Sequence, residues 1–196
     1  MKRVLTLAAV LTAVAVAPAS AQLFDVLTAP KTLIDRAIEA RSAGDIAKDN
    51  EIVLKVNGVM AEVKTIGAAT EIYEQRLLVT GIFDDKAEYD RFERGVRAVK
   101  GVKKLYWHVA YVGKDDSRRK TMLGWADTTA MAVKAQGRLV GTAGVADVNF
   151  RTTADPFGTV YLLGRARSAE EAKKAVARAK DGTGVRKVVS YVEVRP

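Results

Sequence analysis

The sequence predicts an α+β protein of two tandem αββαβ units, each a small mixed sheet covered by two helices. Two observations lead to this prediction: a strand–helix–strand phrase occurs twice without a gap, and another helix and strand precede each copy. The copies run over residues 77–112 and 161–194, and equivalent positions are 83 residues apart. Identical residues occupy several of these positions: Gly81 and Gly164, Glu88 and Glu171, Gly101 and Gly184, Val109 and Val192.

The helix inside each copy has a clear start signal. A capping box opens it in both copies, with Asp85 and Glu88 in the first and Ser168 and Glu171 in the second. Apolar or small residues then recur at helical spacing, which predicts one buried face. These residues are Tyr89, Phe92 and Val96 in the first copy and Ala172, Ala175 and Ala179 in the second.

Two pairs of glycines mark the ends of the neighbouring elements. We expect Gly81 and Gly164 to close the strand before each helix, and Gly101 and Gly184 to follow its last turn. The second pair should adopt positive φ, because a left-handed residue commonly ends a helix. Each copy closes on an alternating strand, with Leu105, Trp107, Val109 and Tyr111 on one face in the first and Val188, Ser190, Val192 and Val194 in the second.

A further helix and strand are predicted upstream of each copy. In the first unit, Asp49 is expected to cap a helix, and residues 69–73 form a strand. In the second unit, Asp127 precedes the helix, residues 145–152 form a strand, and residues 155–158 form a hairpin turn. The residues expected to face the core are Ile52, Val56, Val59 and Val63 in the first helix and Ala130, Val133, Gly137 and Val140 in the second.

The N-terminus has the pattern of a secretory signal peptide. Lys2 and Arg3 precede an apolar stretch over residues 4–17, and Ala19-Ser20-Ala21 is a small-residue cleavage site. The stretch is shorter than the roughly 20 residues of a membrane span, so a cleaved signal is favoured over a retained anchor. Cleavage after Ala21 gives a mature N-terminus at Gln22 and a periplasmic protein.

Five segments make up the predicted organisation. Residues 1–21 are the signal peptide, and residues 22–44 are a helical segment that docks either on the folded units or on a membrane. The first unit covers residues 45–113, and the second covers residues 121–196. The charged residues 114–120 are predicted to link them.

The order of the elements, the paired glycines and the lead-in Trp125-Ala126-Asp127-Thr128-Thr129 to the second unit resemble the BON domain, a bacterial envelope module. Two such units behind an export signal resemble osmotically inducible periplasmic proteins and dual-BON outer-membrane lipoproteins. The resemblance covers about residues 45–196, but the lipoprotein branch needs a cysteine that this chain lacks. It implies phospholipid binding by the first helix of the second unit.

Composition and isolated polar residues give no support for catalysis. The formal charge of +9, or +7 without the signal peptide, favours an anionic partner, and export argues against nucleic acid. Without cysteine there is no thiolate ligand or nucleophile, and His108 alone supports neither a triad nor a metal site. Asp84 and Asp85 are explained by helix capping, and no glycine-rich phosphate loop occurs. We therefore expect no cofactor, no metal and no enzymatic activity.

The candidate binding surface is the first helix of the second unit. Apolar and cationic side chains recur there at helical spacing and are expected to face outward, where a Trp reaches headgroup depth and cations meet phosphate. An ordinary solvated helix face is the alternative interpretation. The candidate site consists of Trp125, Thr128, Met131, Lys134, Ala135 and Arg138.

These features predict a peripheral envelope protein that binds anionic phospholipid at a membrane surface, with a position at the outer membrane. Such a protein would support envelope integrity or stress tolerance. The alternative is a protein-interaction scaffold, whose partner is an outer-membrane assembly component or is associated with peptidoglycan.

Overall fold

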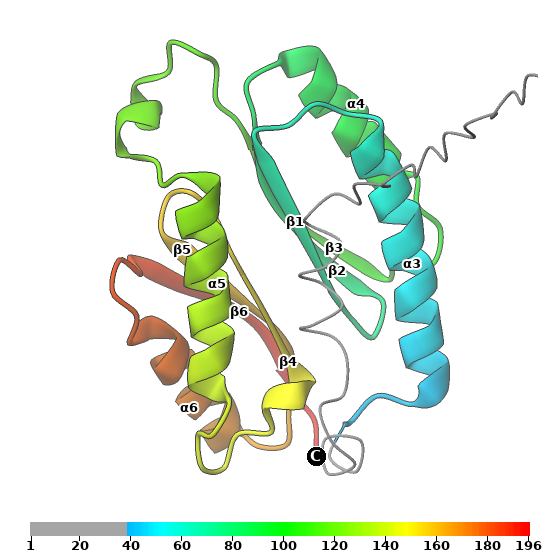
Figure 1. Cartoon of the computed structure of the whole chain (residues 1–196). Helices are drawn as coiled ribbons and strands as arrows, with labels where there is room; N and C mark the ends of the chain where they lie inside the picture. Colours follow the sequence, from blue (N-terminus) through cyan, green and yellow to red (C-terminus); the bar gives the residue numbers. More distant parts are fainter. Residues whose placement is uncertain (1–38) are drawn as a thin grey trace, which may run out of the picture.

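The structure, a computed structural model, describes residues 39–196, which form two αββαβ units (Figure 1). The first unit contains α3 (Ala43–Ala61), β1 (Gly67–Tyr73), β2 (Arg76–Phe83), α4 (Lys86–Arg97) and β3 (Lys104–Tyr111). A short 3₁₀ helix, η1 (Ser117–Thr121), leads to the second unit. That unit contains α5 (Trp125–Leu139), the 3₁₀ turn η2 (Asp147–Asn149), β4 (Phe150–Ala154), β5 (Thr159–Ala166), α6 (Ala169–Lys180) and β6 (Lys187–Val194). The predicted signal peptide and residues 22–38 of the predicted N-terminal segment lie outside the described residues.

Each unit contains one small mixed sheet, as predicted. The strand orders are β1-β2-β3 and β4-β5-β6. The first two strands of each sheet pair antiparallel, and the third pairs parallel with the second. Parallel pairing requires a crossover connection, which α4 supplies in the first unit and α6 in the second. The α+β class with two three-stranded sheets and four helices is therefore confirmed for residues 39–196.

The two units stack as four layers, with the sheets inside and the helices outside (Figure 1). The inner faces of the sheets meet in a cluster of buried side chains, Tyr73, Leu78, Tyr161 and Leu163. The ring of Tyr106 on β3 stacks on that of Tyr191 on β6, with centroids 3.8 Å apart. Each sheet is therefore covered on both faces, which explains how units of this small size bury enough apolar surface.

The helix faces predicted from the repeated phrase are confirmed. Phe92 and Val96 of α4 are buried in the first helix–sheet core, and Ala175 and Ala179 of α6 are buried in the second. The helix caps also hold: Asp85 Oδ1 accepts from the N–H of Glu88 at 3.0 Å, and Ser168 Oγ accepts from that of Glu171 at 3.1 Å. The second half of the predicted capping boxes is different, because Glu88 accepts from the N–H of Lys64 and Glu171 accepts from those of Ala146 and Arg167.

The prediction that Asp49 caps a helix is wrong. Helix α3 begins earlier, at Ala43, and its cap is Ser42, whose Oγ accepts from the N–H of Asp45 at 3.0 Å. Asp49 lies inside the helix and is only 1% exposed. Its carboxylate instead accepts from the backbone N–H groups of Glu74 and Gln75, at 2.9 and 2.7 Å. The β1–β2 turn places both of these residues at positive φ and so directs their N–H groups toward α3.

The glycines have two different roles. Gly101 and Gly184 adopt φ of +97° and +82°, which confirms their predicted conformation. Gly81 and Gly164 do not close strands, because β2 and β5 each continue two residues further. They lie where the neighbouring strand approaches closely: a Cβ at Gly164 would be 2.1 Å from the carbonyl oxygen of Asn149.

The hairpin turn of the second unit forms as predicted, but the preceding strand is shorter. Asp155 Oδ1 accepts from the N–H of Phe157 at 2.9 Å and of Thr159 at 3.0 Å. Strand β4 begins only at Phe150, because the residues before it form η2.

Charged side chains are buried beside β1 and β4. Glu71 on β1 is 9% exposed and Arg151 on β4 is 6% exposed. Burial raises the pKa of the Glu71 carboxyl to about 8, although the charge of Arg151 opposes the rise. Burial also lowers the pKa of Arg151. Glu71 therefore holds a proton in the folded protein at pH values where an exposed glutamate would not.

This proton makes stability depend on pH. Between the ordinary value of 4.5 and about 8, the folded protein binds one proton more than the unfolded chain at Glu71, so stability falls as pH rises. We expect the melting temperature of wild type to drop between about pH 5 and about pH 9 by more than that of Glu71→Gln, measured by circular dichroism. The exposed Glu62→Gln is the matched control. Equal pH dependence of wild type and Glu71→Gln would contradict the assignment.

Candidate functional site

Helix α5 buries a different face from the predicted one. Thr128, Met131, Ala135 and Leu139 are buried, and the last three contribute to the core above the second sheet. The Thr128 hydroxyl donates to its own helix, at the carbonyl oxygen of Gly124. Three of the six candidate residues, namely Thr128, Met131 and Ala135, therefore face inward, and the expectation that they lie on the outer surface is wrong.

The outer face of α5 carries the residues that were expected in the core. Val133 is 38% exposed and Val140, directly after the helix, is 42% exposed. Ala126 and Gly137 are also exposed, and Ala130 is partly so. A Cβ at Gly137 would meet no atom within 4 Å. These residues recur every four and three positions and form one apolar stripe along the helix, which we call the outer stripe: Ala126, Ala130, Val133, Gly137 and Val140.

The two candidate cations of α5 have different environments. Lys134 is exposed at the border of the outer stripe. Arg138 instead donates from Nε to the carbonyl oxygen of Arg178 at 2.9 Å, and from Nη2 to that of Ala179 at 3.0 Å. It thereby satisfies carbonyl groups in the last turn of α6, where a cation also complements the helix dipole. Arg138 therefore has a structural role, whereas Lys134 is exposed and forms no ion pair with another residue of the described range 39–196.

Trp125 opens α5 at the boundary between the units and is 39% exposed. Its ring lies directly against Gly67 of β1, where an added Cβ would be 2.3 Å from Trp125 Cε3. Beside it is a cavity of about 280 Å³, which Ile66, Leu123 and Pro156 help to line. The exposed Trp125 thus stands at the rim of an apolar depression formed by both units.

The basic residues before α5 are mostly engaged within the protein. Arg118 pairs with Asp116 at 2.6 Å, and Arg119 pairs with Asp84 at 3.1 Å. Lys120 is exposed and forms no ion pair within residues 39–196. Trp125 was expected at this surface from the sequence, but Ile66 and Pro156 come from distant segments and gave no sequence signal.

The single histidine lies between the sheets. His108 Nε2 is 2.6 Å from the hydroxyl oxygen of Tyr191, and its ring centroid is 4.4 Å from that of Tyr161. Burial lowers the pKa of His108, the charge of Asp155 opposes this, and that of Lys187 adds to it. These contacts are structural. Within residues 39–196, no group of three or more His, Cys, Asp or Glu side chains is arranged to hold a metal ion.

Comparison with known proteins finds a BON domain at residues 127–196, which begins in α5 and includes the rest of the second unit. A relative from Anaplasma centrale, described as an uncharacterized protein in the gshII 5′ region, is 29% identical over 148 residues. That alignment covers 75% of this chain and 95% of the relative.

Two solved structures of CdsD, a structural protein of the type III secretion system of Chlamydia trachomatis, show a distant likeness. The first is 13% identical, with 74% of this chain and 93% of that chain covered and a TM-score of 0.29. The second, a C-terminal domain, is 12% identical, with 74% and 98% covered and a TM-score of 0.30. TM-scores this low carry no inference about fold or function.

No helix within residues 39–196 is long and apolar enough to cross a bilayer.

Proposed function

We propose that this protein is a non-catalytic component of the bacterial envelope that binds anionic phospholipid through the outer stripe of α5. The observation that carries the proposal is the exposure of Val133 and Val140 beside Lys134, with Trp125 at the start of the same helix. Resemblance to the BON domain implies phospholipid binding by this helix, and the family match begins within it.

The expected strength of binding follows from this composition. Full burial of a valine contributes about 1.5 kcal/mol or more, and a lysine near an anionic leaflet contributes about 1 kcal/mol. Trp125 suits headgroup depth, where one side of the ring is apolar and the other is hydrated. The sum of these free-energy contributions is reduced by the entropy that protein and lipid lose when they become ordered. One molecule therefore associates weakly and reversibly. Several molecules acting on one surface would bind more stably.

The setting of this activity is also part of the proposal. We infer that both units are BON-like, the first from the start of α3 at Ala43 to residue 113 and the second over residues 121–196, and that the signal peptide is removed after Ala21. The mature protein then acts in the periplasm, peripherally at the outer membrane, and supports envelope integrity or stress tolerance. The basic charge of the mature chain favours an anionic surface.

A protein-interaction scaffold is the second candidate, and the outer stripe itself favours it. The small residues Ala126, Ala130 and Gly137 lie on this stripe, and small residues on one helix face allow the backbone of a second helix to approach closely. In this function the same stripe would receive a helix of an outer-membrane assembly component or a peptidoglycan-associated protein.

Vesicle co-sedimentation tests the lipid proposal with a matched pair of variants. Val133→Asp replaces an exposed apolar side chain on the outer stripe, and Leu54→Asp makes the same kind of change on α3, where Leu54 is 72% exposed. We expect wild type to bind vesicles containing phosphatidylglycerol at low salt, and less at high salt. Val133→Asp should weaken binding about tenfold, because it removes an inserted side chain and adds repulsion. Leu54→Asp should bind as wild type does.

Circular dichroism must first show that both variants are folded, as their exposure predicts. Wild type that ignores anionic vesicles at low salt, or equal binding by Val133→Asp and wild type, would overturn the lipid proposal. Two results together would favour the scaffold: wild type does not bind lipid, and wild type recovers a specific envelope partner that Val133→Asp does not recover.

A further inference from the structure

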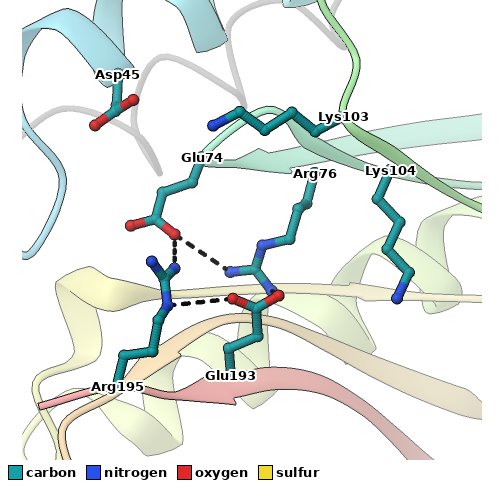
Figure 2. A pocket seen from close by; sticks show the side chains of 7 residues that line it. All are labelled: Asp45, Glu74, Arg76, Lys103, Lys104, Glu193 and Arg195. Atoms are coloured by element: carbon teal, nitrogen blue, oxygen red, sulfur yellow. Dashed lines mark hydrogen bonds and ion pairs between the residues drawn. The ribbon is translucent and has the colours of Figure 1, made fainter.

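A second cavity, the charged pocket, lies at the far end of the seam between the sheets. Its volume is about 390 Å³, and seven charged side chains line it (Figure 2). Residues from the β1–β2 turn, the start of β3 and the end of β6 converge there with Asp45 of α3. No apolar side chain is among the lining residues, so the pocket suits a polar, charged ligand.

The acidic side chains of the charged pocket are already engaged. Glu74 pairs with Arg195, and more distantly with Arg76 and Arg165, each at 3.8 Å. Glu193 lies 3.3 Å from Arg76 Nη1 and 3.2 Å from Arg195 Nε. Figure 2 shows the contacts of Arg76 and Arg195 with the two glutamates. These two carboxylates thus pair with three arginines. The group of five side chains therefore has an excess of positive charge.

The third carboxylate, that of Asp45, accepts a hydrogen bond from the Ser42 hydroxyl at 2.6 Å. Hydrogen bonding by Ser42 is the main cause of the lowered pKa of Asp45, and the charge of Lys103 contributes to it. Asp45 is therefore ionised and held at the helix start.

The cations of the charged pocket differ in how far a ligand could reach them. The Arg76 side chain is 5% exposed and donates to the carbonyl oxygens of Tyr191 and Gly164, yet its Nε has no acceptor within residues 39–196. This nitrogen has almost no accessible surface, so a ligand in the pocket would meet the exposed cations at its rim rather than Nε. Lys103 and Lys104 are exposed at the rim, and neither forms an ion pair with a described residue.

We propose that the charged pocket binds the phosphate ester of a polyol. A phosphate ester carries several acceptor oxygens and a charge of up to about −2, which matches the two lysines, Lys103 and Lys104, better than a single carboxylate does. The remaining volume and the polar lining suit hydroxyl groups rather than an acyl chain or an aromatic ring. The ester is either a soluble polyol phosphate or the headgroup of an anionic lipid.

The position of the charged pocket separates it from the proposed lipid-binding surface. Arg76 begins β2, while Ile82, beside the Trp125 cavity, lies six residues further along the same strand. At about 3.3 Å per residue this is roughly 20 Å. The residues that line the pocket belong to the strand ends and to α3, whereas the outer stripe belongs to α5, a helix on the other side of the two sheets from α3 (Figure 1). The two surfaces therefore share no residue.

Titration calorimetry and amide chemical shifts test this proposal on the mature protein. The probes are inorganic phosphate, glycerol 3-phosphate, and glycerol as the neutral control. We expect saturable, salt-sensitive binding of glycerol 3-phosphate, with shifts at Gln75, Lys104 and Arg195 and none with glycerol. Lys103→Gln/Lys104→Gln should weaken binding at least tenfold. The control Lys173→Gln/Lys180→Gln removes two exposed charges from α6 and should bind as wild type does.

A vesicle arm distinguishes the two sources of the ester. Loss of binding to phosphatidylglycerol vesicles in Lys103→Gln/Lys104→Gln, but not in the control, would identify a lipid headgroup. Unchanged vesicle binding with weakened glycerol 3-phosphate binding would identify a soluble ester. The proposal is overturned if wild type shows no saturable binding of either phosphate probe and the vesicle arm shows no difference. It is also overturned if the pocket variant and the control bind all probes alike. Either result leaves the Val133→Asp experiment unaffected.

Discussion

Asp49→Ala is expected to destabilise the protein by about 3 kcal/mol or more, because it removes one acceptor that serves several buried donors. Besides the N–H groups of Glu74 and Gln75, the carboxylate accepts from Gln75 Nε2 at 2.9 Å and pairs with Arg41 at 3.1 Å. Alanine would leave the N–H groups of Glu74 and Gln75 without this acceptor and would release the β1–β2 turn from α3. Urea denaturation followed by circular dichroism measures the loss.

A neighbouring aspartate provides the control for this prediction. Asp45 lies one helical turn earlier and is only partly buried, so Asp45→Ala should cost no more than about 1 kcal/mol. Asp49→Asn keeps an acceptor oxygen and should fall between the two. A loss below about 1 kcal/mol for Asp49→Ala would show that water replaces the carboxylate and that the turn does not depend on it.

Two glycine-to-alanine substitutions should shift stability in opposite directions. Gly164→Ala would force a Cβ to within 2.1 Å of the Asn149 carbonyl oxygen, so β4 must move away from β5. We expect a loss of about 3 kcal/mol or more, since backbone rather than a flexible side chain is in the way. Gly137→Ala places its Cβ in open space within α5 and should stabilise by about 0.5–1 kcal/mol.

The same urea titrations measure the stability of both glycine variants. If Gly137→Ala binds vesicles as tightly as wild type does, a methyl group is accommodated on the outer stripe. Destabilisation by Gly137→Ala would mean that this face is covered in solution. A stable Gly164→Ala protein would mean that the two strands separate at little cost.

The fold was predictable because its signals are local. The helix caps at Asp85 and Ser168 and the glycines at 101 and 184 act within a few residues of the chain, and their repetition at one spacing indicated the order of the elements. The residues whose predicted roles were wrong have roles that are set by distant segments of the chain. Asp49 binds a turn 25 residues away, and Gly164 makes room for the strand beside it.

The orientation of α5 was not predictable, because the helix carries two apolar stripes. The stripe with Met131 and Leu139 has the longer side chains, which fill the space above the second sheet, and the stripe with Val133 is left outside. Helical spacing alone cannot distinguish these stripes. Of the candidate site, Trp125 and Lys134 are exposed as expected, whereas the charged pocket combines segments that no local pattern connects.

The contact between His108 and Tyr191 has a consequence for how the two halves evolve. These residues are 83 positions apart, so they are equivalent positions of the two units that touch each other. In a dimer of identical single units, a position on the symmetry axis meets its own copy, and one residue type must suit both sides. A covalently joined pair has no such restriction, so an imidazole nitrogen can face a hydroxyl. The same freedom lets one half present an apolar outer helix while the other retains a different surface.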